Sequence, residues 1–125
     1  MGEAQMTNLD IQCAELGRRL ADIRGMDEKT VNALMSVLEE QGPYAMFLYL
    51  RARHNQVAGP VTERVLNFLR KPGIFGHKVG ETNDVFDAIQ RLAEDLDDLL
   101  FVRDLLRTAL SYARYHLKTK GGGAS

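Results

Sequence analysis

The sequence predicts an all-α fold, and three observations support that prediction. Apolar residues recur every three or four positions along most of the 125 residues, which is the period of a helix with one buried face. No two strand-like segments are present that could pair and satisfy each other's backbone. The chain is 45% hydrophobic and 26% charged, as ordinary globular proteins are. We therefore expect a single-domain compact bundle of five to six helices over 1–120, ending in a long amphipathic helix, with 121–125 as a flexible tail.

Two amphipathic helices are predicted in the first third of the chain. Apolar positions in 6–23 are spaced by three or four residues, and Gly25 ends the pattern. Asp27 is a suitable N-cap for a second helix, which continues to Glu40. The following Gly42-Pro43 pair then predicts a corner between helices.

The next segment is predicted to form two more helices. Pro43 suits the first turn of a helix, where its missing N–H has no intrahelical acceptor, and an apolar run follows over 44–50. Such a short run could also be a buried strand, but helix is favoured because no partner strand exists. Gly59-Pro60 predicts a break, after which a fourth helix is expected over 61–69.

The connection 71–82 is predicted to be irregular because it contains three glycines. Its Phe75 has two interpretations, a mobile basic tip that stacks on an unpaired base or an anchor in the core. The Gly73 to Gly76 spacing resembles a KH-domain clamp only superficially, because no strands flank it, and no P-loop pattern follows.

The C-terminal third predicts a short helix and a long one. Asn83 and Asp84 can cap a fifth helix whose apolar face includes Val85, Ile89 and Leu92. The acidic stretch 94–98 predicts a kink or a restart. The last helix is expected over 97–118 and should be the spine of the core.

Charge is segregated along the chain although the formal net charge is only −1. Residues 1–50 carry −4, residues 51–80 carry +5, residues 81–98 carry −6 and residues 99–125 carry +4. The net value therefore hides two basic blocks that would suit a polyanion.

One basic row stands out on the last predicted helix. At 100° per residue its cations fall on one stripe beside the apolar arc, where a phosphate backbone could lie. The row consists of Arg103, Arg107, Arg114 and Lys118. The alternative is that these are surface cations, which helix C-termini favour in any case. Arg51, Arg53 and Lys78 belong to the second basic block, and the two surfaces could converge in the fold.

No catalytic, metal-binding or cofactor-binding constellation is recognisable. Cys13 lies on the inward stripe of the first helix, where a thiol is inert, and the histidines His54, His77 and His116 have no ligand at metal-site spacing. The acids 94–98 lack an EF-hand pattern and suit a helix start. We expect a non-enzymatic protein with no cofactor, no metal and no small-molecule substrate.

The compartment is also an expectation from composition. A single cysteine allows no intrachain disulfide, which is typical of a cytoplasmic protein. The N-terminus lacks a basic segment followed by an apolar block, and no apolar stretch is long enough to span a membrane. The sequence thus predicts a chain that is neither exported nor inserted in a membrane.

The order of these features resembles a known family. The segment Glu-Glu-Gln-Gly-Pro-Tyr-Ala-Met-Phe-Leu-Tyr-Leu at 39–50 and the terminal helix from Phe101-Val102-Arg103 to Tyr115-His116-Leu117 carry the resemblance. They are similar to the small helical subunit of type III CRISPR RNA-guided interference complexes, particularly the Cmr type. The resemblance spans about 8–118, and the family pattern is not matched in the glycine-rich 71–82 connection or the acidic 81–98 block.

The resemblance implies a non-catalytic subunit that stacks in copies along the complex. Its partners would be the repeated backbone subunits, the large signalling subunit, further copies of itself, and guide and target RNA. Asp95, Asp97 and Asp98 would then suit a basic protein neighbour or the basic face of the next copy. The alternative is a helical adaptor that binds only proteins through its segregated charge.

Overall fold

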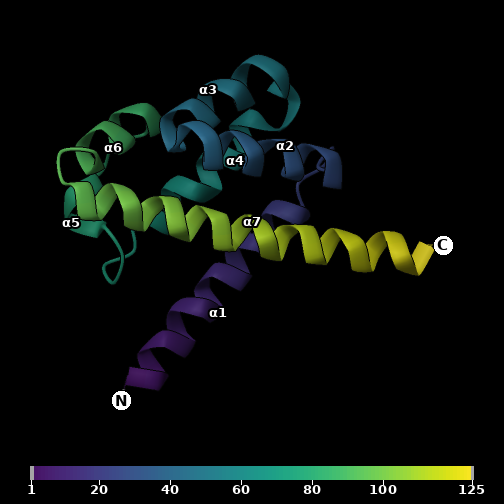
Figure 1. The fold of residues 1–125 in the computed structure, drawn as a ribbon, viewed down its shortest axis with the longest axis horizontal. Coiled ribbons are helices and arrows are strands. Elements are labelled where there is room, and N and C mark those ends of the chain that lie inside the picture. The colour runs from purple at the N-terminus through teal and green to yellow at the C-terminus, as the bar shows by residue number, and fades with distance from the viewer. Residues whose placement is uncertain (1, 125) are drawn as a thin grey trace.

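Helices make up all the regular structure in the computed structural model, which describes residues 2–124 and the side chains of residues 8–120 (Figure 1). They are α1 (Gly2–Ala21), α2 (Glu28–Gln41), α3 (Pro43–Arg53), α4 (Asn55–Leu69), α5 (Gly76–Val79), α6 (Val85–Leu92) and α7 (Leu96–Ala124). No strand occurs in this part of the chain, so the all-α prediction is confirmed. The helices number seven rather than five to six because the 71–82 connection contains α5.

Helix α7 is the spine that the sequence predicts. It runs the length of the molecule, and α1 crosses it near its middle (Figure 1). Helices α2, α3 and α4 lie together along one side, and α5 and α6 lie near the first turns of α7. The backbone of α7 continues to Ala124, so the prediction of a flexible 121–125 tail stays a prediction, and Ser125 is outside the described residues.

One continuous core joins these helices. Its fully buried members include Leu34 and Leu38 from α2, Phe47 from α3, Leu69 from α4 and Leu106 from α7. Four of these side chains lie on the apolar stripe that defines their helix in the sequence, and Phe47 belongs to the apolar run over 44–50. Their burial is the main favourable term for the fold, at about 1.5–3 kcal/mol for each side chain removed from water.

The two longest helices approach each other at a glycine. A Cβ atom added at Gly17 of α1 would lie 2.6 Å from the Ala109 carbonyl oxygen, 2.6 Å from the Tyr112 Cβ and 2.8 Å from the Ala113 nitrogen. These distances are shorter than van der Waals contact. The backbones of α1 and α7 therefore meet with small residues on both sides, which is why the crossing can be so close.

The break between α3 and α4 falls at His54, so the predicted break at Gly59-Pro60 is wrong. His54 has φ −135° and ψ 49°, outside the helical region, and α4 continues through Pro60. A proline inside a helix removes the hydrogen bond to the carbonyl four residues earlier, here that of Gln56. Gln56 is an exposed residue in the first turn of α4. The missing hydrogen bond therefore falls at a solvent-exposed end of the helix.

The glycine-rich connection is ordered by an aromatic anchor. Phe75 is only 3% exposed and packs edge-on against Phe101 of α7, with ring centroids 5.5 Å apart. The interpretation of Phe75 as a base-stacking tip is therefore wrong, and the core-anchor alternative is correct. The next residue is Gly76, where a side chain would not fit, because a Cβ there would lie 2.9 Å from the Arg70 carbonyl oxygen.

The acidic stretch restarts the helix, as predicted. Helix α6 ends at Leu92, and the Asp95 carboxylate accepts a hydrogen bond from the Asp97 backbone N–H at 2.8 Å. A carboxylate in this position satisfies a free N–H of the first turn and is stabilised by the helix dipole. Asp95 is therefore the cap from which α7 begins.

Gly17 provides a direct test of the α1–α7 crossing. Gly17→Ala is expected to lower the free energy of unfolding by about 2 kcal/mol, because the added methyl overlaps backbone that cannot move freely. The matched control is Gly59→Ala in α4, where a Cβ meets nothing within 4 Å. That control should stabilise the protein by about 0.5–1 kcal/mol, since alanine is the better helix former. Urea denaturation measures both, and a stabilising Gly17→Ala would contradict the close crossing.

Candidate functional site

The predicted basic row on α7 lies along α2. Arg103 and Arg107 both contact the Glu39 carboxylate, Arg103 at 3.6 Å. Arg114 donates a hydrogen bond to the Asn32 side-chain oxygen at 3.4 Å, and Lys118 lies 3.4 Å from the Glu28 carboxylate. The row is thus one side of a polar seam between two helices.

The seam keeps a single antiparallel register. A step of seven residues from Glu39 to Asn32 on α2 matches the step from Arg107 to Arg114 on α7, and a further step of four leads to the Glu28–Lys118 pair. Steps of seven and four residues keep side chains on one helix face. The complementary spacing is visible in the sequence, but which helix would lie beside α7 is not.

Pairing reduces the charge that this row presents to a ligand. The Nε atoms of Arg103 and Arg107 are buried, whereas the side chains of both arginines and of Lys118 remain partly exposed. Exposed ion pairs of this kind contribute little free energy each, about 0–1 kcal/mol, so a polyanion could still compete for them. RNA binding by the row stays a prediction.

Two residues predicted to face different partners bind each other. Lys78, assigned to the basic block, forms an ion pair with Asp98, assigned to the protein interface. The hydrogen bond to Asp98 holds the pKa of Lys78 above its usual value. With Asp95 capping α7, only Asp97 of the three predicted interface acids has neither an ion pair nor a side-chain hydrogen bond within the described chain.

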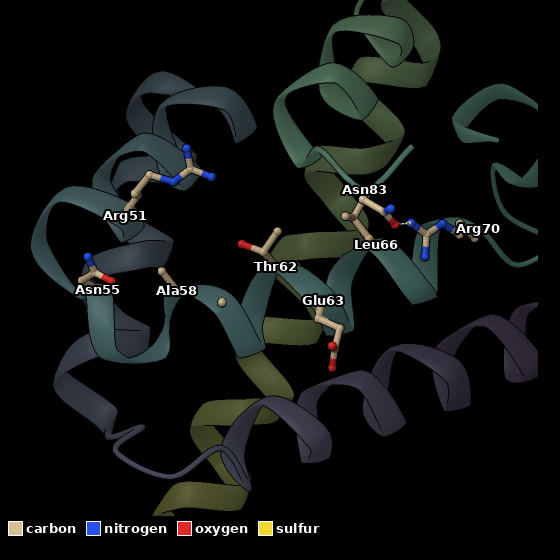
Figure 2. A pocket seen from close by; sticks show the side chains of 9 residues that line it. Arg51, Asn55, Ala58, Thr62, Glu63, Leu66, Arg70 and Asn83 are labelled. Carbon is tan, nitrogen blue, oxygen red and sulfur yellow. Dashed lines mark hydrogen bonds between the residues drawn. The ribbon is translucent and has the colours of Figure 1, made fainter. Parts of the chain in front are cut away.

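Arg51 has a different environment. It stands over the Phe86 ring with 4.7 Å between its guanidinium carbon and the ring centroid, and it lines a pocket of about 530 Å³ beside α4. Figure 2 shows Arg51 and Arg70 at opposite ends of this pocket with Thr62 between them. Arg70 is held there by a hydrogen bond to the Asn83 side-chain oxygen at 3.0 Å.

Two further depressions adjoin this pocket around the first half of α4. The second depression shares Gly59 and Glu63 with the Arg51 pocket, and Arg24 also lines it. The third depression shares Gly25 and Gln56 with the second. The third contains Arg53 and Lys29. Together they present six cations. Arg64 is paired with Glu63 at 3.8 Å, and the other five are what we call the α4 basic surface: Arg24, Lys29, Arg51, Arg53 and Arg70.

The members of the α4 basic surface differ from the α7 row in their partners. None of the five forms an ion pair with a carboxylate among residues 8–120, although Glu63, Asp22 and Asp27 line the same depressions. Asp22 is engaged by Lys120, and Asp27 accepts the Thr30 N–H as the cap of α2. Positive charge therefore dominates this surface.

Sequence reasoning identified Arg51 and Arg53 but missed the other three. Arg24 and Lys29 lie in a block whose net charge is negative, and Arg70 closes a helix that was predicted to start later. The packing of the α1–α2 connection against the start of α4 brings in Arg24 and Lys29, and Arg70 lies at the other end of the helix, where it hydrogen-bonds Asn83. No signal in the linear sequence indicates this.

Cys13 is buried at the α1–α7 contact. Burial raises the pKa of its thiol to about 11, and the nearby Asp10 carboxylate adds to the rise. Within the described residues, no group of three His, Cys, Asp or Glu side chains is placed to hold a metal ion. The same part of the chain contains no helix of the length and hydropathy that a bilayer crossing needs.

Comparisons with known proteins leave the family open. No protein-family model matches the chain, and neither the curated proteins nor the solved structures compared with it give a match. Geometry and charge therefore carry the functional argument.

Glu39 provides a test of the seam. Glu39→Gln removes the charge shared by two arginines and is expected to lower the free energy of unfolding by about 0.5–1 kcal/mol. Glu40→Gln is the control, because Glu40 is exposed and has no ion pair in the described chain. Urea unfolding measures the stability of both variants. If the two variants are equally stable, the Glu39 ion pairs do not hold the seam in solution.

The Cys13 thiol should react slowly in the folded protein. At pH 8 a pKa of about 11 leaves roughly a hundredfold less thiolate than an ordinary cysteine has, so alkylation by iodoacetamide should slow by at least that factor. The rate should keep rising as the pH is raised towards 11, and urea should restore ordinary reactivity. A rate that levels off near pH 9 in the folded protein would show that the thiol is not buried.

Proposed function

We propose that this protein is a non-catalytic RNA-binding subunit and that its α4 basic surface contacts the phosphate backbone without reading sequence. The observation that carries the proposal is a set of five cations, none paired with a described carboxylate, in adjoining depressions along α4, from Arg53 before its first turn to Arg70 just past its last. Cations without a carboxylate partner are available to neutralise phosphates and release their counterions. Backbone contacts of this kind position an RNA but specify no base.

Local geometry supports the same surface. Arg51 is oriented by the Phe86 ring, and Arg70 by neutral hydrogen-bond acceptors, so both guanidinium groups are held in place without losing their charge. The first turn of α4 contains no acid, and its cap residue His54 makes no side-chain hydrogen bond there. Free N–H groups at a helix start add to the attraction for an anion.

At the level of the assembly, we propose a small subunit of a cytoplasmic type III CRISPR RNA-guided complex. The resemblance of the 39–50 segment and of the last helix supports this, together with the segregated charge. Its partners would be the repeated backbone subunits, the large signalling subunit, further copies of itself, and guide and target RNA. Arg103, Arg107, Arg114 and Lys118 would contribute where RNA displaces their α2 partners.

Removing cations from the α4 basic surface tests RNA binding. The variant Arg51→Ala, Arg53→Ala is expected to bind single-stranded RNA about tenfold more weakly at low salt. It should also reduce the slope of log K against log salt by about 1.4, since each phosphate contact contributes about 0.7. Fluorescence anisotropy across a salt series measures both quantities.

Two control variants make this result specific. Arg18→Ala, Arg19→Ala removes the same charge from α1, where both arginines are paired with Glu15, and should leave affinity close to wild type. Arg103→Ala, Arg107→Ala, Arg114→Ala tests the seam row. If the α4 variant and the α1 control lose affinity equally, the α4 basic surface is not the RNA site.

The alternative function is a protein-only adaptor, which one observation favours. Arg103, Arg107, Lys118 and Lys78 all form ion pairs with carboxylates of this chain, so much of the basic charge seen in the sequence is already engaged. An adaptor predicts partner capture that survives nuclease treatment and yields no RNA crosslinks. Co-elution of a repeat-derived guide RNA with the tagged protein would decide for the RNA-guided complex.

A further inference from the structure

A groove between α1 and the first half of α7 combines an apolar floor with an acidic rim. It measures about 520 Å³, and its lining includes Leu9, Asp10 and Cys13 from α1 and Phe101, Asp104 and Thr108 from α7. We call it the acidic groove. Among residues 8–120, whose side chains the structure describes, no lysine, arginine or histidine lines it.

The floor is apolar and accessible. Phe101 is 38% exposed even though one edge of its ring packs against Phe75, and Leu9 is partly buried beside it. Leu96 and Leu100, earlier on α7, are 67% and 44% exposed but do not line the groove. A large apolar side chain left exposed in a groove, as Phe101 is, is typical of a site that another molecule covers.

The rim follows helical spacing. Asp97, Phe101, Asp104 and Thr108 succeed one another at steps of four, three and four residues, so acids and groove-lining residues share one face of α7. Asp10 faces the groove from α1, where it accepts the Tyr112 hydroxyl at 2.8 and 2.9 Å. Arg107 contacts Asp104 at 3.2 Å, yet the Asp104 side chain remains 64% exposed and can accept a second cation.

We infer that the acidic groove binds an amphipathic helix of a partner protein whose apolar stripe is flanked by lysines or arginines. A groove between two helices suits a third helix, which would place apolar side chains on the floor. The two carboxylates that line the groove, Asp10 and Asp104, together with Asp97 farther along the same face of α7, favour a basic flank and disfavour an acidic one. The groove shares no residue with the α4 basic surface, so the inference stands or fails independently of RNA binding.

A second copy of this chain fits the groove less well than a separate protein. Elsewhere on the described surface, the exposed large apolar side chains are Ile11, Tyr44, Leu48 and Tyr115. They belong to three helices and form no stripe longer than two residues. The apolar faces of its helices are otherwise used in the core.

Two synthetic helices provide the test. A labelled leucine–lysine peptide of about 18 residues, five helical turns, is compared with a leucine–glutamate peptide that has the same apolar face. The lysine peptide is expected to bind the full-length protein at least about tenfold more tightly, measured by fluorescence anisotropy. Equal binding of the two peptides would overturn the proposal.

Variants locate the binding. Asp10→Asn, Asp104→Asn should weaken the lysine peptide about fivefold, because two exposed ion pairs are lost. Glu40→Gln, Glu81→Gln removes the same charge outside the groove and should leave affinity unchanged. Thr108→Arg, which places a cation in the groove, should abolish binding while circular dichroism stays native. The proposal fails if Glu40→Gln, Glu81→Gln weakens binding as much as Asp10→Asn, Asp104→Asn does. It also fails if the wild type is a dimer that Thr108→Arg converts to monomer.

Discussion

The crossing of α1 over α7 at Gly17 is the constraint on which the rest of the structure depends. The absence of a side chain at Gly17 lets the two backbones approach, with Ala109 and Ala113 opposite. That approach buries Leu16 and Leu20 and makes α1 and α7 the most extensive helix pair in the bundle. Because packed helices have no room to slide, the crossing also decides where α1 diverges from α7. The acidic groove lies on one side of this divergence.

The second organising contact is the antiparallel seam between α2 and α7. Its ion pairs add little stability individually, but they share one register with the buried stripe of Leu34 and Leu38. Polar groups that match only in one register disfavour the alternatives, so the seam contributes specificity to the bundle. Because the α7 cations pair with α2 carboxylates, an external ligand must compete with those carboxylates to bind them.

Charge is consequently arranged in space differently from its arrangement along the chain. The +4 block of the last helix is partly balanced by acids of the −4 block, and Lys78 is balanced by Asp98 of the −6 block. What remains is a basic surface around α4 and an acidic groove between α1 and α7. The two proposals together would place this protein between a polyanion and a basic protein.

Local sequence was sufficient for the helices and for most of the core. Helical periodicity, the Asp27 cap and the Asp95 restart act within a few residues, so they can be read without knowing the fold. The predicted break at Pro60 is wrong, and the sequence allows two interpretations of Phe75, because tertiary contacts decide both: α4 continues through the proline, and the core buries the aromatic ring. The sequence alone determined the all-α class, the helices other than α5 and the α3–α4 boundary, and which residues carry charge. Only the tertiary structure decided which cations remain free, because an ion pair between helices depends on which faces meet.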